Sequence, residues 1–144
     1  MKLGWGLVVT VLSLVCWGGQ LIAWLAPATA QRLGLMEAET DVEPVYWADI
    51  RGEAAWDSLS LWPMVIAGAL LMAGQDSWAY FGLVGGGAYL YFAGRGIIVR
   101  LAMRRRALRI GGADRVRVGL IALAVWGAMA TITIVAALVS LEGA

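Results

Sequence analysis

The sequence predicts an all-α integral membrane protein, a four-helix bundle in which residues 1–144 form a single membrane domain. Apolar residues make up 61% of the chain and charged residues 15%, whereas globular domains carry roughly 45 to 50% and about 25%. Residues 3–26 and 118–141 each form a run of 24 residues without a charge. A bilayer core needs roughly 20 such residues, so both runs are long enough to cross a membrane.

The two middle spans form a predicted helical hairpin, because only Gln75, Asp76 and Ser77 separate them. One continuous helix through residues 59–94 would be roughly 50 Å long, too long for a hydrocarbon layer of about 30 Å. Tryptophans near the span ends, where indoles settle at the membrane interface, support this count. These are Trp5, Trp24, Trp56, Trp62 and Trp78. The four predicted helices are residues 3–26, 56–74, 78–100 and 117–141.

Two prolines give local predictions. Pro27 is expected to end the first helix, because its ring clashes with the carbonyl four residues back. Pro63 lies inside the second predicted helix and leaves the Leu59 carbonyl without its usual donor. We expect Ser58 or Ser60 to bind the groups that are freed there.

Charge is divided between two segments of opposite sign. The acidic loop, residues 28–55, and the start of the next helix carry seven acids, and the basic loop, residues 101–116, lies within an arginine-rich stretch. The acids are Glu37, Glu39, Asp41, Glu43, Asp49, Glu53 and Asp57. The arginines are Arg95, Arg100, Arg104, Arg105, Arg106, Arg109, Arg115 and Arg117. Short arginine-rich loops stay in the cytoplasm, so four spans place both loops inside and both termini outside.

Same-side loops predict ion pairs between the two middle helices. In a hairpin that turns at Asp76, Asp57 lies opposite Arg95, and we favour this pair by charge, depth and register. An unpaired guanidinium at that depth costs on the order of a few kcal/mol. Two outer pairs follow from the same register: Glu53 with Arg100, and Asp49 with Arg104. These pairs are either a structural ion ladder or the polar end of a cavity for an anionic or quinone-like amphiphile.

Small residues predict close helix packing. Gly82 and Gly86 on the third helix stand in a G-x-x-x-G relation, and Gly127 on the fourth is a counterpart. In lipid, such residues let helix backbones approach each other. This stripe serves either internal bundle packing or a face for self-association or a protein partner.

Composition also excludes some functions. The chain has no histidine and one cysteine, Cys16, so it cannot by itself assemble the usual haem, copper or zinc ligand sets, and we expect no metal site. We expect no nucleic-acid partner, because the net charge is only +1 and no recognition module accompanies the arginines. The run from Arg100 to Arg117 attracts anionic lipid head groups at about 1 kcal/mol each, although topology anchoring explains it more simply.

Four short motifs carry a family resemblance: Ala26-Pro27, Arg32-Leu33-Gly34-Leu35, Asp49-Ile50-Arg51-Gly52 and Gly94-Arg95-Gly96. Together they resemble the DoxX-like proteins and their relatives, which are small bacterial four-helix membrane proteins. The resemblance implies a four-helix bundle in a bacterial inner membrane. Some DoxX-type proteins are linked to quinone-dependent sulfur oxidation, which implies a quinone-linked oxidoreductase component as one alternative.

The leading functional prediction is a non-catalytic accessory or assembly subunit, without a cofactor, that packs against partner helices or a second copy of itself among membrane lipids. The first alternative is binding or transport of a lipophilic or anionic ligand, such as a lipid or quinone, in a cavity inside the bundle near Arg95. Asp57, Glu53 and Arg100 are the other candidate residues there. An enzyme acting on lipids or quinones would use Asp57 or Glu53 as acid or base.

Overall fold

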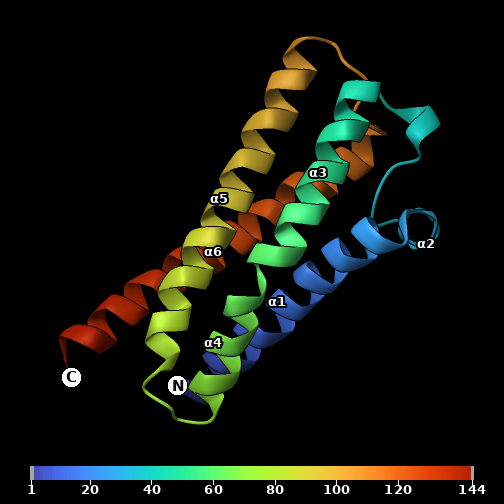
Figure 1. Cartoon of the computed structure of the whole chain (residues 1–144). Helices are drawn as coiled ribbons and strands as arrows, with labels where there is room; N and C mark the ends of the chain where they lie inside the picture. The colour runs from blue at the N-terminus through green and yellow to red at the C-terminus, as the bar shows by residue number, and fades with distance from the viewer. Residues whose placement is uncertain (1, 144) are drawn as a thin grey trace.

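The computed structural model describes residues 2–143, and every regular element in that range is helical. Four helical segments are long and apolar enough to cross a membrane: α1, α3 together with α4, α5, and α6. This confirms the predicted multi-pass four-helix bundle (Figure 1). The elements are α1 (Lys2–Leu25), α2 (Pro27–Arg32), the 3₁₀ helix η1 (Glu39–Asp41), α3 (Pro44–Ser60), α4 (Trp62–Met72), α5 (Trp78–Arg105) and α6 (Ala113–Glu142).

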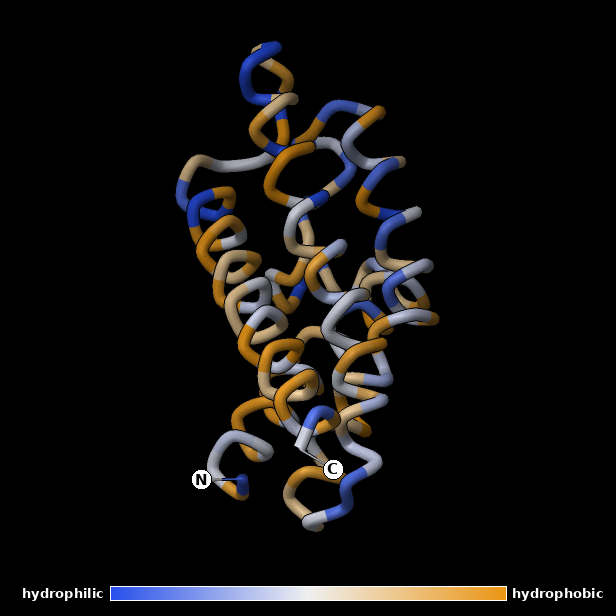
Figure 2. Tube along the Cα trace, turned by 90° about the vertical axis from the view of Figure 1, so that its left-hand side faces the viewer, coloured by the Kyte–Doolittle hydropathy of each residue, from blue (hydrophilic) through white to orange (hydrophobic). Residues whose placement is uncertain are grey.

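The charged connections lie together at one end of the bundle. In Figure 1 the α5–α6 connection is at the top, the α1–α3 connection runs from α2 at the right up to the start of α3, and the termini and the α4–α5 turn are at the bottom. Figure 2 shows the hydrophilic segments concentrated near that upper end. Arg115 Nη1 lies 2.9 Å from Glu37 Oε2, and the Glu43 backbone N–H donates to the Arg109 carbonyl at 2.8 Å. The acidic and basic segments therefore meet each other, as the four-span count predicts.

The second span begins earlier than predicted. We expected residues 28–55 to be a loop and a helix to start at residue 56, but α2, η1 and most of α3 lie in that range. Pro44 stands in the first turn of α3, where its missing N–H has no intrahelical acceptor in any case. The prediction was wrong because a hydropathy sum treats every charged residue as unfavourable in a membrane span, whereas the acids on α3 have ion-pair partners on α5.

A break at Leu61 separates α3 from α4, with Pro63 in the first turn of α4. As predicted, the Leu59 carbonyl has no backbone donor at Pro63, but a different side chain from the one expected donates to it. The indole N–H of Trp62 donates to the Leu59 carbonyl at 3.1 Å. Ser58 instead donates to the Ala54 carbonyl at 2.7 Å, so the prediction for Ser58 was wrong.

Glycines hold the helices at short range. On α5, a Cβ at Gly86 would lie 2.5 Å from Ile134 Cγ1, and one at Gly82 would lie 3.4 Å from Thr133 Cγ2. On α6, a Cβ at Gly127 would lie 3.3 Å from the Ala93 Cβ. All three predicted packing glycines therefore lie within the chain's own α5–α6 interface.

Two further close approaches, both to backbone atoms, involve α4. A Cβ at Gly6 of α1 would lie 3.0 Å from the Gly68 carbonyl oxygen, and one at Gly85 of α5 would lie 2.8 Å from the Met64 Cα. Backbone atoms cannot yield as a flexible side chain can, so these sites admit only glycine without a shift of the helices. The α4 helix is thus clamped between α1 and α5.

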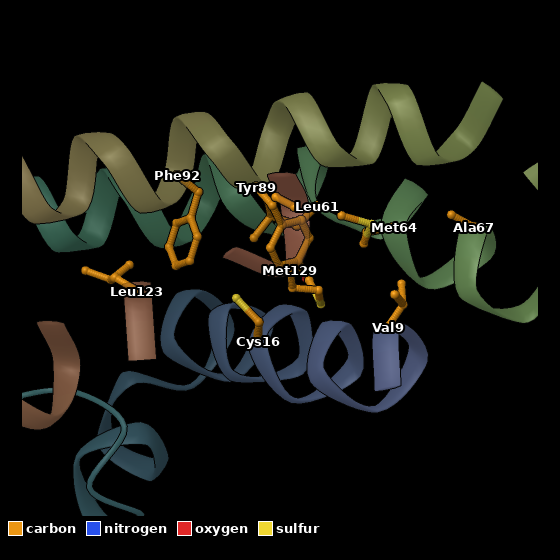
Figure 3. Close-up of a cluster of buried hydrophobic side chains, with 10 residues drawn as sticks. Val9, Cys16, Leu61, Met64, Ala67, Tyr89, Phe92, Leu123 and Met129 are labelled. Atoms are coloured by element: carbon orange, nitrogen blue, oxygen red, sulfur yellow. The ribbon is translucent and has the colours of Figure 1, made fainter. Parts of the chain in front are cut away.

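The core fills the space among α1, α4, α5 and α6 with apolar side chains (Figure 3). Tyr89 is fully buried at its centre, and its hydroxyl donates to the Ser13 carbonyl at 3.1 Å. Phe92 contacts Tyr89 edge-on at a ring distance of 6.2 Å. The hydrogen bond from Tyr89 to Ser13 fixes α5 against α1 in the middle of the bundle.

Candidate functional site

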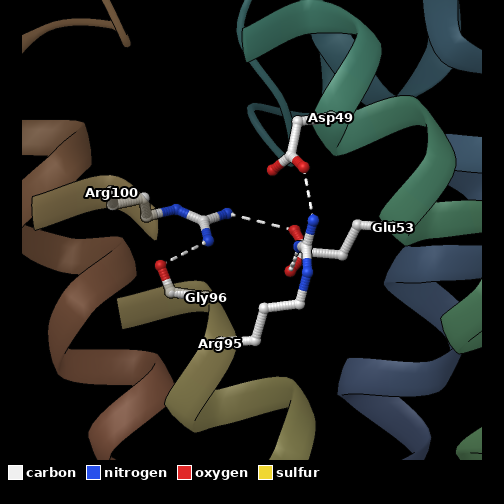
Figure 4. Close-up of polar contacts among 5 residues, drawn as sticks. All are labelled: Asp49, Glu53, Arg95, Gly96 and Arg100. Carbon is white, nitrogen blue, oxygen red and sulfur yellow. Dashed lines mark hydrogen bonds and ion pairs between the residues drawn. The ribbon is translucent and has the colours of Figure 1, made fainter. Parts of the chain in front are cut away.

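An ion cluster joins α3 to α5 at the charged end of the bundle (Figure 4). Asp49 and Glu53 are one helical turn apart, so both face α5. The Arg95 guanidinium lies between them: Nη1 donates to Glu53 Oε1 at 3.1 Å, and Nη2 donates to Asp49 Oδ1. Arg100 Nη2 lies 3.6 Å from Glu53 Oε2 and its Nη1 donates to the Gly96 carbonyl at 3.0 Å.

Glu53 is the central member of this cluster, because it contacts both arginines and its side chain is only 6% exposed. Two carboxylates and two guanidinium groups leave the cluster formally neutral. Such pairing is what allows ionisable groups to remain near hydrocarbon. Arg95 lies 17 residues after Trp78, about 26 Å along the helix, a separation close to the thickness of a hydrocarbon layer of about 30 Å.

The predicted pairing of Asp57 with Arg95 is wrong, as is that of Asp49 with Arg104. The Arg95 side chain extends past Asp57 toward the charged end and contacts Asp49 and Glu53. Long basic side chains near membrane boundaries extend toward the polar end in this way. The register also assumed one straight second helix, whereas α3 and α4 are separated at Leu61.

Asp57 lies one turn deeper than Glu53 and is 3% exposed. Within the described part of the chain, its Oδ2 atom has no hydrogen-bond partner. Burial of an unpartnered carboxylate oxygen is costly. Asp57 is therefore an unsatisfied group beneath the cluster, and it does not belong to the ion ladder.

A cavity of about 470 Å³ lies beside the cluster, between α1 and α6. Ligand cavities commonly have volumes of roughly 300 to 1,000 Å³. Small residues on the two facing helices make space for the cavity. They are Gly19 and Ala23 on α1, and Gly119 and Ala122 on α6. The closest helix packing is instead α5 on α6, α1 on α4 and α4 on α5.

The cavity has an apolar wall and a polar end. Its apolar side chains include Val15, Cys16, Ile50, Phe92, Leu123 and Trp126. Its polar side chains are Gln20, Glu37, Tyr46, Glu53, Arg100, Asp114 and Arg115. Val15 and Val118 stand on its edge with exposed fractions of 62% and 65%, so one side of the cavity reaches the outer surface of the bundle.

Trp126 and Arg100 define the two ends of this space. The Trp126 indole N–H donates to the Leu12 carbonyl at 3.1 Å and ties α6 to α1 at the deep end. At the polar end the Arg100 guanidinium carbon lies 6.0 Å from the centre of the Tyr46 ring. At the rim, Glu37 and Arg115 form an ion pair.

The structure brings some of the predicted candidate residues together and not others. Glu53 and Arg100 line the cavity, whereas Arg95, on which the prediction centred, is engaged by Asp49 and Glu53 beside it. Sequence reasoning missed Tyr46, because it lay in a predicted loop. Once α3 is known to begin at Pro44, Tyr46, Ile50 and Glu53 follow a spacing of four and three residues that places them on one helix face.

Comparison of the chain with protein-family models, with curated proteins and with solved structures gives no match. The resemblance to DoxX-like proteins therefore stays a prediction. Among residues 2–143, no group of three or more histidine, cysteine or acidic side chains is gathered in a way that would hold a metal ion.

Proposed function

We propose that this protein binds a lipophilic molecule with a polar head in the cavity between α1 and α6. The observation that carries the proposal is the cavity itself, which is apolar along its length, polar at one end and open on one side toward the surrounding lipid. A molecule with a long apolar tail enters such a site sideways from the membrane. Its head then lies beside Tyr46, Arg100 and Glu53.

The charges of the lining favour a neutral head over an anionic one. Glu37, Glu53 and Asp114 give three negative charges against two positive charges from Arg100 and Arg115. Glu53 and Glu37 are also close to those arginines, at 3.6 Å and 2.9 Å. A neutral head that accepts hydrogen bonds from Arg100 or the Tyr46 hydroxyl avoids adding a negative charge. A quinone, with carbonyl acceptors and an isoprenoid tail, belongs to this class.

We place the protein in a bacterial inner membrane, with the arginine-rich end in the cytoplasm and both termini outside. The preference of arginine-rich segments for the cytoplasmic side supports this orientation. The cavity then opens into the inner leaflet, with the ion cluster close to the cytoplasmic boundary.

Cys16 provides a test, because it is the only cysteine in the chain and it lines the cavity, where it is 4% exposed and therefore reacts only through that space. In liposomes, we expect a short-chain ubiquinone analogue to slow the reaction of Cys16 with N-ethylmaleimide. The Ala122→Trp variant fills the cavity and is expected to abolish this protection. Ala128→Trp adds the same side chain at an exposed position on α6 outside the cavity lining and is the matched control.

Purification in mild detergent followed by mass spectrometry gives the second readout. We expect a lipophilic molecule to accompany the natural chain and the Ala128→Trp variant, but not Ala122→Trp. If no lipophilic molecule is bound and the analogue leaves the labelling rate unchanged, the proposal is wrong. The accessory-subunit function stays a prediction, which stoichiometric partner subunits in the same preparation would support.

A further inference from the structure

We infer a second site that borders the cavity and shares only Asp114 with its lining: the groove between α5 and α6 at the arginine-rich end binds the phosphate head group of an anionic phospholipid. The groove has a volume of about 490 Å³. Arg104 from α5 and Arg117 from α6 line it on its two sides. Nothing in the proposed function requires this site.

The arginines divide into two groups according to their partners. Of the eight between Arg95 and Arg117, four are in ion pairs with acids of the first connection and α3: Arg95, Arg100, Arg109 and Arg115. Within residues 2–143, no carboxylate lies within ion-pair distance of the other four, which are Arg104, Arg105, Arg106 and Arg117. This end of the molecule therefore carries positive charge that the protein itself does not neutralise.

The groove is built for an amphiphile. Below Arg117, the side chains of Leu120, Ile121 and Ala124 follow at intervals of three, four and seven residues, so they form an apolar strip along one face of α6. A bound phosphate at the arginines would have its acyl chain along this strip. A free phosphate ion gains nothing from the strip, which is why we commit to a phospholipid.

The depth of the groove matches that of a lipid head group. Arg104 lies 26 residues after Trp78 in the same helix, about 39 Å along its axis at 1.5 Å per residue. The hydrocarbon layer is about 30 Å thick. With Trp78 at the opposite interface, Arg104 stands beyond the hydrocarbon, at the level of the phosphates.

The charge of the groove matches one phosphodiester. Asp114, in the first turn of α6, is the one acid among its lining residues, so the two arginines leave a formal charge of +1. A guanidinium group binds phosphate oxygens with two parallel hydrogen bonds. An anionic glycerophospholipid brings one negative charge and places it where both guanidinium groups reach it.

Native mass spectrometry of the full chain, with phosphatidylglycerol or phosphatidylcholine added, tests the inference. We expect one phosphatidylglycerol to bind at least about tenfold more tightly than phosphatidylcholine, given the usual attraction of basic residues near anionic lipid. Arg104→Gln/Arg117→Gln is expected to remove this preference. Arg105→Gln/Arg106→Gln removes the same charge from the same end without touching the groove lining, and we expect it to keep the preference within about twofold.

The other outcomes overturn the inference. Equal losses in the two double variants would mean a diffuse attraction to the arginine-rich end without a site. Competition by millimolar inorganic phosphate as strong as that by the lipid would mean that the apolar strip has no role. Because all four arginines are exposed, both variants are expected to fold, and circular dichroism checks that they do.

Discussion

Replacing Glu53 with alanine removes the carboxylate that contacts both Arg95 and Arg100. Its hydrogen bond to Arg95 at 3.1 Å is charge-assisted, and such bonds contribute about 1.5 to 3 kcal/mol. The 3.6 Å contact with Arg100 lacks hydrogen-bond geometry and adds on the order of 1 kcal/mol or less. Because Arg95 keeps Asp49 and its side chain is 30% exposed, we expect a total loss of about 2 to 3 kcal/mol in the free energy of unfolding.

Reversible unfolding in mixed detergent micelles measures this loss, and double-mutant cycles assign it to a pair. We expect Glu53→Ala and Arg95→Ala to be coupled by about 1 kcal/mol or more, whereas groups without contact add within about 0.5 kcal/mol. Asp57→Asn with Arg95→Ala is the matched cycle one turn deeper. A coupling in the Asp57 cycle as large as that in the Glu53 cycle would refute the ion-pair register described here.

Three further predictions concern packing and topology. Gly85→Ala is expected to lower the free energy of unfolding by about 1 to 3 kcal/mol, because the new Cβ overlaps the α4 backbone. Gly87→Ala is the control and should cost nothing, because nothing lies within 4 Å of its Cβ position. Trp126→Phe removes the hydrogen bond to the Leu12 carbonyl and is expected to lower the free energy of unfolding by about 1 kcal/mol. It is also expected to speed N-ethylmaleimide labelling of Cys16. An unchanged labelling rate would mean that Trp126 does not close the deep end of the cavity. Alkaline phosphatase fused after Ala144 is expected to be active in bacterial cells, and activity of a cytoplasmic reporter there would reverse the orientation.

The positions of α1, α6 and the α4–α5 turn were predictable from the sequence. The charge-free runs at residues 3–26 and 118–141 correspond to α1 and most of α6. Gln75, Asp76 and Ser77 mark the turn between α4 and α5. These features depend on composition along the chain, because every span in a bilayer must meet the same requirement of length and apolar character.

The polar half of the second span was not predictable in the same way. The segment 44–57 carries Asp49 and Glu53, whose ion-pair partners Arg95 and Arg100 lie on α5. The hairpin register predicted the pair of Glu53 with Arg100, but hydropathy along the chain does not indicate that acids with such partners lie within a helix. The Gly6–Gly68 contact was missed for a similar reason, because single glycines on two helices do not reveal that they face each other.

The cavity was anticipated only as an alternative and in a different place. Its position depends on where α1 and α6 diverge, which small residues permit but do not specify. The emphasis on Arg95 followed from its predicted depth, and the structure shows that Arg95 is already engaged by two acidic partners. Arg100, nearer the end of α5, lines the cavity instead of Arg95.

The pairing of α3 with α5 has a consequence for how the protein enters the membrane. When α3 first emerges from the ribosome, Asp49 and Glu53 have no counterions, because Arg95 and Arg100 are synthesised more than forty residues later. Until α5 is made, those carboxylates lack the partners that offset their burial, so stable insertion of the second span is expected to depend on the third.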